Sequence, residues 1–195
     1  MTTTYHLIIN GPYEKPKQHL KYIREIRRFE LVDVRRPAGY VVASEASESF
    51  DDPGIFIPLS WVNKIRERVD NWRDAGYPGI TSVTKELLEY WKNPEREMKL
   101  FFCQLEAIET LIWLVEAPQN EKQGIDISGD GSSFQRLCSK MATGSGKTIV
   151  MAMIIAWQII NKVTYPKETK FSKNIFIVAP GLTVKSRLQV LYPSN

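Results

Sequence analysis

The chain has 195 residues, a formal net charge of +4 and a pI near 9.0. Its composition, 43% hydrophobic and 25% charged, is that of a soluble globular protein and excludes a disordered or low-complexity chain. The mild positive charge fits a nucleic-acid partner, although many unrelated proteins share it.

The composition also excludes several kinds of site. The two cysteines, Cys103 and Cys138, have no CxxC spacing and neither lies near a histidine, so a disulfide framework or a zinc site has no support. The N-terminus has no basic region of a signal peptide, and the longest apolar stretch, Ile149–Ile160, is too short to span a bilayer. We therefore expect a cytoplasmic protein without a membrane partner.

Residues 1–58 are expected to form short strands separated by turns, because proline and other turn residues bound each apolar run. The runs are Leu7–Ile9, Phe29–Val32, Tyr40–Val42 and Ile55–Ile57. The polar stretch Ser44–Asp52 is expected to be a loop.

Two helices are expected next, at 60–75 and at about 84–91. Apolar residues recur on one face of the first at spacings typical of a helix, namely Trp61, Ile65, Val69 and Trp72. Asn93-Pro94-Glu95 has the form of a further helix start. No motif in 1–99 carries chemistry, so these residues are predicted to be a smaller mixed α+β accessory segment.

From Leu100 onward the pattern changes to alternating strands and helices, which predicts an α/β fold with a parallel sheet. A helix is expected at Leu105–Glu116, with one apolar face made by Leu105, Ile108, Leu111, Ile112 and Val115. The later expected elements are a surface loop at 118–133, a strand near Arg136–Met141, an apolar helix to about Lys162, a strand at Ile175–Val178 and a helix starting near Thr183.

Residues 142–148, Ala-Thr-Gly-Ser-Gly-Lys-Thr, have the form of a phosphate-binding loop. Gly144 and Gly146 allow tight turns in which backbone N–H groups approach phosphates, and Lys147 supplies a positive charge. Thr148 offers its hydroxyl to a magnesium ion. The expected nucleotide-binding residues of this loop are Thr143, Gly144, Ser145, Gly146, Lys147 and Thr148, and the expected ligands are ATP and Mg²⁺.

The loop departs from the general P-loop in one informative position, where Met141 stands in place of a glycine. The remaining pattern, Ala-x-Gly-x-Gly-Lys-Thr, resembles motif I of the superfamily-two helicases and translocases. That resemblance counts against small-molecule kinases and most transport ATPases. It implies a RecA-like parallel sheet, which is incomplete in this chain.

Two flanking segments resemble other motifs of the same superfamily. Gln104 is similar to the glutamine of the motif that reads the adenine edge, a task that suits a carboxamide because it offers a donor beside an acceptor. Residues 177–183 resemble motif Ia, which implies a DNA backbone contact. The expected DNA-binding residues are Pro180, Gly181, Thr183 (as a helix cap), Lys185 and Arg187. The alternatives are a polar residue at a helix start for Gln104, and an ordinary strand-to-helix turn for 180–187.

Residues 100–195 as a whole resemble the Res subunit of type III restriction enzymes. The resemblance implies an ATP-driven motor that moves on duplex DNA, in which Lys147 is a catalytic residue, and a modification methyltransferase subunit as a further partner. The motor's Asp-Glu box is missing, so we expect that this chain alone does not hydrolyse ATP. Two alternatives stay open: a P-loop kinase or small-molecule ATPase, and a non-catalytic nucleotide-binding remnant.

Overall fold

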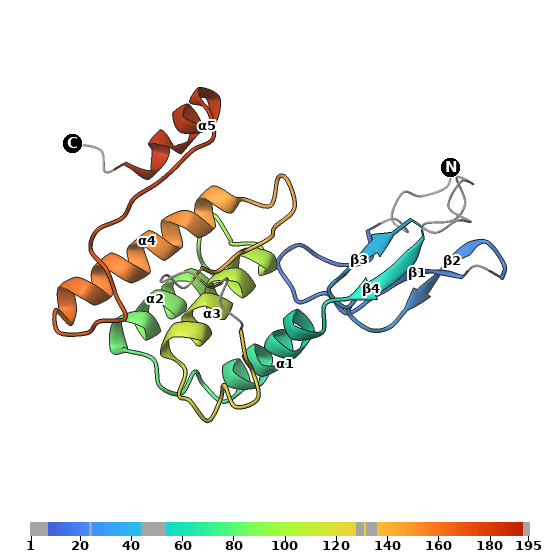
Figure 1. The fold of residues 1–195 in the computed structure, drawn as a ribbon, viewed down its shortest axis with the longest axis horizontal. Coiled ribbons are helices and arrows are strands. Elements are labelled where there is room, and N and C mark those ends of the chain that lie inside the picture. The colour runs from blue at the N-terminus through green and yellow to red at the C-terminus, as the bar shows by residue number, and fades with distance from the viewer. Residues whose placement is uncertain (1–7, 24, 44–53, 128–130, 132–135, 193–195) are drawn as a thin grey trace. The chain divides into compact units, whose positions relative to one another are not determined.

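The computed structural model describes residues 8–23, 25–43, 54–127, 131 and 136–192. Its elements are β1 (His19–Ile23), β2 (Arg28–Val32), β3 (Gly39–Val42), β4 (Ile55–Pro58), α1 (Ser60–Asp74), α2 (Ser82–Lys92), α3 (Phe102–Glu116), α4 (Lys147–Thr164), α5 (Leu182–Arg187) and the 3-10 helix η3 (Leu188–Leu191) (Figure 1).

Contacts divide the chain into two compact units, Met1–Asp70 and Asn71–Asn195, with the boundary inside α1. Residues 71–99 thus fall in the same unit as the P-loop. A division into domains at 99/100 stays a prediction.

The first unit consists of two antiparallel hairpins and the first part of α1. In the hairpin β1–β2, Leu20 pairs with Leu31 and Tyr22 with Phe29, and β3 pairs with β4 in the second hairpin. Three of the four expected strands are confirmed as β2, β3 and β4. The strand expected at 7–9 does not form at residues 8 and 9, and residue 7 lies outside the described residues. The expected loop at 44–52 also lies outside them.

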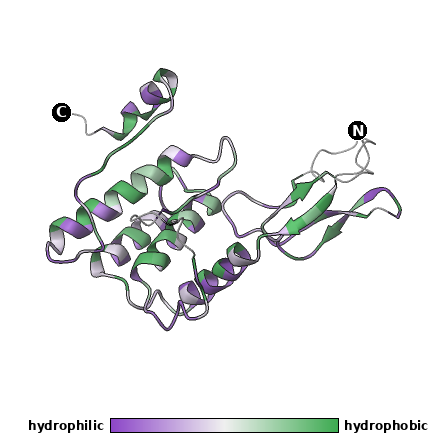
Figure 2. Cartoon of the chain, viewed as in Figure 1, coloured by the Kyte–Doolittle hydropathy of each residue, from purple (hydrophilic) through white to green (hydrophobic). Residues whose placement is uncertain are grey.

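This unit has almost no interior of its own. None of the described residues from 8 to 68 is buried, and apolar side chains lie along the strands, as Figure 2 shows for β3 and β4. Phe29 is 63% exposed and Ile55 53% exposed. Two-stranded sheets bury little surface by themselves, so the hairpins leave apolar faces open to a further contact.

The second unit is a helical cluster around a tryptophan-rich core. Helix α4 packs against both α2 and α3 (Figure 1). The buried apolar residues of this unit include Leu88, Trp91, Ile108, Ile112, Trp113, Val150, Met153 and Trp157. No helix in the described parts of the chain has the length and apolar character needed to cross a membrane.

The expected helices are confirmed, with bounds that differ by a few residues. In α3 the apolar face was only partly predicted: Ile108 and Ile112 are fully buried, whereas Leu105, Leu111 and Val115 are half-buried. The buried face of α3 differs from the predicted apolar face because it also includes two carboxylates, Glu109 and Glu116. These two residues are seven positions apart, which is two helical turns.

The helix start expected at Asn93 is wrong. Asn93 instead ends α2 as its C-cap, and its side-chain oxygen accepts a hydrogen bond from the backbone N–H of Glu95 at 2.8 Å. An asparagine that bonds the backbone two residues later closes a turn, which is the competing use of the same side chain.

The strands expected at Arg136–Met141 and Ile175–Val178 do not form in this structure. All strands of the described residues lie in the two antiparallel hairpins. A strand requires a neighbour for its backbone N–H and C=O groups, and neither segment pairs with another described segment. The RecA-like parallel sheet therefore stays a prediction.

A buried polar cluster fastens α4 to the two helices before it. The carboxylate of Glu116 accepts hydrogen bonds from the Thr81 backbone N–H at 2.9 Å, the Thr84 hydroxyl at 2.7 Å and the Trp157 indole at 2.7 Å. The Asn161 amide donates to the Thr84 hydroxyl at 3.0 Å. Because α4 begins at Lys147, this cluster fixes the axis of the helix that follows the P-loop.

The other buried carboxylate ties α3 to the end of α1. Arg73 donates to Glu109 through Nε at 2.9 Å, and the Tyr77 hydroxyl donates to it at 2.6 Å. Lys92 lies 3.8 Å from the same carboxylate. Burial, and then the negative charge of Glu109, raise the pKa of Tyr77 far above its ordinary value, so its hydroxyl stays a donor.

Candidate nucleotide-binding site

The P-loop forms a tight turn that leads directly into α4. Gly144 and Gly146 both have left-handed backbone conformations, with φ of 79° and 77°. Gly146 is the N-cap residue of α4, which starts at Lys147. A side chain at either glycine would be strained in this region of φ, so the sequence pattern and the observed turn agree.

The carbonyl oxygen of Ala142 accepts hydrogen bonds from the ammonium group and from a hydroxyl group of the loop. Lys147 Nζ donates to it at 2.7 Å and Ser145 Oγ at 2.6 Å. Lys147 is exposed, so its ammonium group can exchange this carbonyl for another oxygen acceptor without leaving a buried cavity. A phosphate oxygen is such an acceptor and carries more negative charge than a carbonyl.

The first amides of α4 point outward from the helix start. Within the described residues, the backbone N–H groups of Lys147 and Thr148 donate to no acceptor, nor does the Thr148 hydroxyl. Together with the helix dipole, such amides favour an anion at this end. Thr148 lies in the first turn of α4, where its hydroxyl can ligate a magnesium ion that accompanies the phosphates.

Gln104 lies against this loop. Its Nε2 donates to the carbonyl of Ser145 at 3.0 Å, and its Oε1 accepts from the backbone N–H of Phe101 at 2.9 Å. The side chain is 2% exposed. A Cβ atom on Gly146 would come within 2.2 Å of Gln104 Nε2. The structure thus brings Gln104 and the P-loop together, with the amide engaged by two backbone groups.

One comparison with known proteins matches the segment that contains this site. Residues 97–191, just under half of the chain, match the family model described as "Type III restriction enzyme, res subunit". This segment is Res-like. The match contains Gln104, the P-loop and α5, so the resemblance read from the sequence is confirmed over these residues. No curated protein and no solved structure matches the chain.

At the level of the family, the Res-like segment is that of a helicase-like ATPase. The expected DNA-binding residues lie at the far end of the segment, around α5. Gly181 is the N-cap of α5 and Thr183 lies inside its first turn, so the expectation that Thr183 caps the helix is wrong. Lys185 and Arg187 lie in the last turn of this six-residue helix, and both are exposed, as are Pro180 and Gly181.

Sequence reasoning missed the polar residues that support the Res-like site. Glu109 and Glu116 were not predicted to be buried, although two acids at a spacing of seven in an otherwise apolar helix are a signal for partnered carboxylates. The role of the Ala142 carbonyl could not be predicted, because it depends on the path of the backbone.

Proposed function

We propose that the chain carries the ATP-binding part of an ATP-dependent DNA translocase or helicase, of the kind found in type III restriction enzymes. One observation carries the proposal: within a Res-like segment, the buried amide of Gln104 is hydrogen-bonded to the backbone of a P-loop. A P-loop alone would fit many ATPases, and the glutamine at this place narrows the class to helicase-like motors.

In this proposal ATP and Mg²⁺ bind at residues 143–148. Lys147 leaves the Ala142 carbonyl for the β- and γ-phosphates, and the Thr148 hydroxyl ligates the magnesium ion. The sheet beside the site is RecA-like, and Gln104 contacts the adenine after rearrangement of its two backbone bonds. Duplex DNA contacts 180–187, and a methyltransferase subunit supplies modification.

The decisive experiment is a titration of the chain with a fluorescent ATP analogue and Mg²⁺. Replacement of Lys147 by Ala removes a charge-assisted bond to phosphate and should weaken binding at least about tenfold. Lys140→Ala is the matched control, because Lys140 is an exposed lysine outside the loop. Equal affinity of the chain and the Lys147→Ala variant would overturn the proposal.

The DNA part of the proposal requires a second measurement, on the intact enzyme in which this segment occurs. ATP hydrolysis that rises on addition of duplex DNA is expected for a translocase. Hydrolysis that is independent of DNA would favour the small-molecule ATPase instead, and transfer of the γ-phosphate to a small acceptor would favour a kinase.

A further inference from the structure

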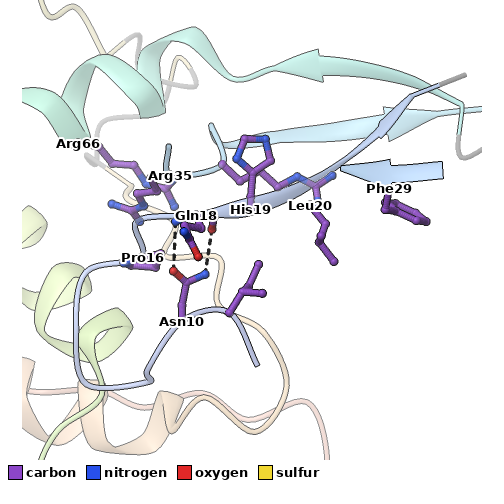
Figure 3. Close-up of a pocket in the computed structure, with 10 residues that line it drawn as sticks. Asn10, Pro16, Gln18, His19, Leu20, Phe29, Arg35 and Arg66 are labelled. Atoms are coloured by element: carbon purple, nitrogen blue, oxygen red, sulfur yellow. Dashed lines mark hydrogen bonds between the residues drawn. The ribbon is translucent and has the colours of Figure 1, made fainter. Parts of the chain in front are cut away.

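A basic pocket lies in the N-terminal unit, which the proposed function leaves without a role. Its volume is about 380 Å³, and three arginines line it: Arg35, Arg36 and Arg66. His19 and Phe29 line the same pocket. Figure 3 shows Arg35 and Arg66 beside Gln18, with Phe29 toward the other end.

The walls of this pocket are held by hydrogen bonds. The Asn10 side chain donates to the carbonyl of Gln18 at 2.9 Å and accepts from the backbone N–H of Gln18 at 3.2 Å, which fixes the approach to β1 (Figure 3). His19 Nδ1 donates to the carbonyl of Val34 at 2.7 Å, which fixes the segment that carries Arg35. Arg35 and Arg36 therefore project from one fixed segment, and Arg66 projects from α1.

An aromatic groove adjoins the basic pocket. A second pocket, of about 470 Å³, shares His19, Phe29 and Arg36 with the first and is also lined by Tyr22 and Phe56. The rings of Tyr22 and Phe29 lie 5.2 Å apart, and the Arg36 guanidinium lies 5.6 Å from the centre of the Phe56 ring.

We propose that the two pockets together bind single-stranded nucleic acid. The arginines hold backbone phosphates, and the exposed face of Phe29 stacks on a base. Cations beside open aromatic rings are the combination that single-strand binding uses, because every base presents a ring face and every nucleotide a charge. An acidic peptide would also suit the arginines, but it would leave the exposed ring of Phe29 without a matching group.

This inference goes beyond the proposed function, since it uses neither the P-loop nor residues 180–187. It gives the N-terminal unit a task in a nucleic-acid motor, namely to hold a single strand. It also accounts for a unit that exposes aromatic residues on short hairpins and buries none of the described residues from 8 to 68.

The test measures binding of a fluorescent oligothymidylate of about 12 nucleotides to the 195-residue chain by anisotropy, over a range of salt concentrations. The pocket variant replaces Arg35, Arg36 and Arg66 by Gln. We expect an affinity loss of about tenfold or more, and a salt slope that falls by about 2, because three phosphate contacts contribute about 0.7 each for a single strand.

Three further variants distinguish binding at the pocket from an effect of net charge and from an effect on folding. Replacement of the same arginines by Lys keeps the charges and should retain most of the binding. The matched control replaces three exposed lysines of the other unit, Lys85, Lys167 and Lys173, by Gln and should change the affinity less than about twofold. Phe29→Leu should weaken binding of the single strand about fivefold and should leave binding of duplex DNA of equal length unchanged.

Each contrary outcome overturns the inference. Unchanged binding in the Arg-to-Gln variant would show that the pocket does not bind the strand. An equal loss of affinity in the lysine control would show that binding depends only on non-specific charge. Competition by an oligoglutamate peptide as effective as by oligothymidylate would assign the pocket to an acidic protein. Lys147→Ala should not change the oligothymidylate affinity, so failure of the ATP site and failure of this pocket are distinguishable.

Discussion

The side-chain amide of Gln104 donates a hydrogen bond to the carbonyl of Ser145 across 41 positions of the chain, at 3.0 Å. The same amide accepts from the Phe101 backbone, so one buried side chain joins the start of α3 to the P-loop. A Cβ atom on Gly146 would meet this amide at 2.2 Å and would displace it. The conformation of the P-loop is thus supported by a side chain of α3.

Replacement of Gln104 by Leu tests this link. Leucine fills a similar volume but cannot make the two hydrogen bonds of the Gln104 amide, which should lower the free energy of unfolding by about 1–3 kcal/mol. The ATP affinity should fall as the loop loses its support. Thermal unfolding and titration with a fluorescent ATP analogue measure the two effects. Gln119→Leu, at an exposed glutamine in the turn after α3, is the control and should change neither.

The nucleotide preference of the Gln104→Leu variant separates two roles of this residue. If Gln104 reads the adenine, the variant should lose its preference for ATP over GTP. If it only supports the loop, both affinities should fall by the same factor. A variant that binds ATP like the unchanged chain would contradict both roles.

Much of the helical unit could be predicted from the sequence, because its signals are local. The apolar period of α4 and the Gly-x-Gly-Lys-Thr pattern each depend on neighbours in the chain. The strand β1 was missed, since polar residues such as His19 and Lys21 alternate with its apolar ones and no continuous apolar run marks it.

The missed parts of the site depend on contacts between distant residues. Glu116 obtains its partners from Thr81, Thr84 and Trp157, up to 41 positions away. Likewise, Arg66 approaches Arg35 and Arg36 only when α1 lies beside the first hairpin. Neither grouping follows from a spacing along the chain, so sequence patterns could identify the P-loop and Gln104 but not these two groupings.

The carboxylate of Glu116 is predicted to be essential for the stability of the helical unit. It accepts three hydrogen bonds while 5% exposed, so Glu116→Ala would remove the acceptor of three donors, two of them buried, and open a cavity. We expect the free energy of unfolding to fall by about 3–5 kcal/mol, measured by urea denaturation. The matched control is Glu89→Ala on the exposed face of α2, which should stay within about 0.5 kcal/mol. Equal losses in the two variants would contradict the role of the cluster.

The raised pKa of Tyr77 predicts how the stability of the chain depends on pH in the alkaline range. Its pKa in the folded state is raised above the ordinary value of 10.0, by burial and then by the charge of Glu109. The folded chain therefore keeps this proton at a pH where the unfolded chain releases it. The contribution of Tyr77 is complete below pH 10.0 and declines as the pH rises further, with a slope of up to about 1.4 kcal/mol per pH unit.

Tyr77→Phe removes this titration. The variant should be less stable than the unchanged chain at neutral pH, because Glu109 loses a donor. Its stability should fall less steeply above pH 10.0. Urea denaturation at a series of pH values compares the two slopes, with Tyr90→Phe, at a 60% exposed tyrosine of α2, as the control. Parallel curves for the Tyr77→Phe variant and the unchanged chain would refute the role of this proton.

The residues around α5 give the last prediction, which concerns duplex DNA. Lys185 and Arg187 are exposed cations on a short helix of the Res-like segment. If each neutralises one phosphate, replacement of both by Gln should lower the salt slope of duplex binding by about 2, because each contact contributes about 0.9. The affinity for a fluorescent ATP analogue should not change, since neither side chain belongs to the P-loop. Anisotropy titrations with a duplex of mixed sequence make the measurement, and Lys167→Gln with Lys173→Gln is the charge-matched control. An unchanged salt slope would leave 180–187 as an ordinary turn into a helix, and DNA contact would then have to be sought on other surfaces of the chain.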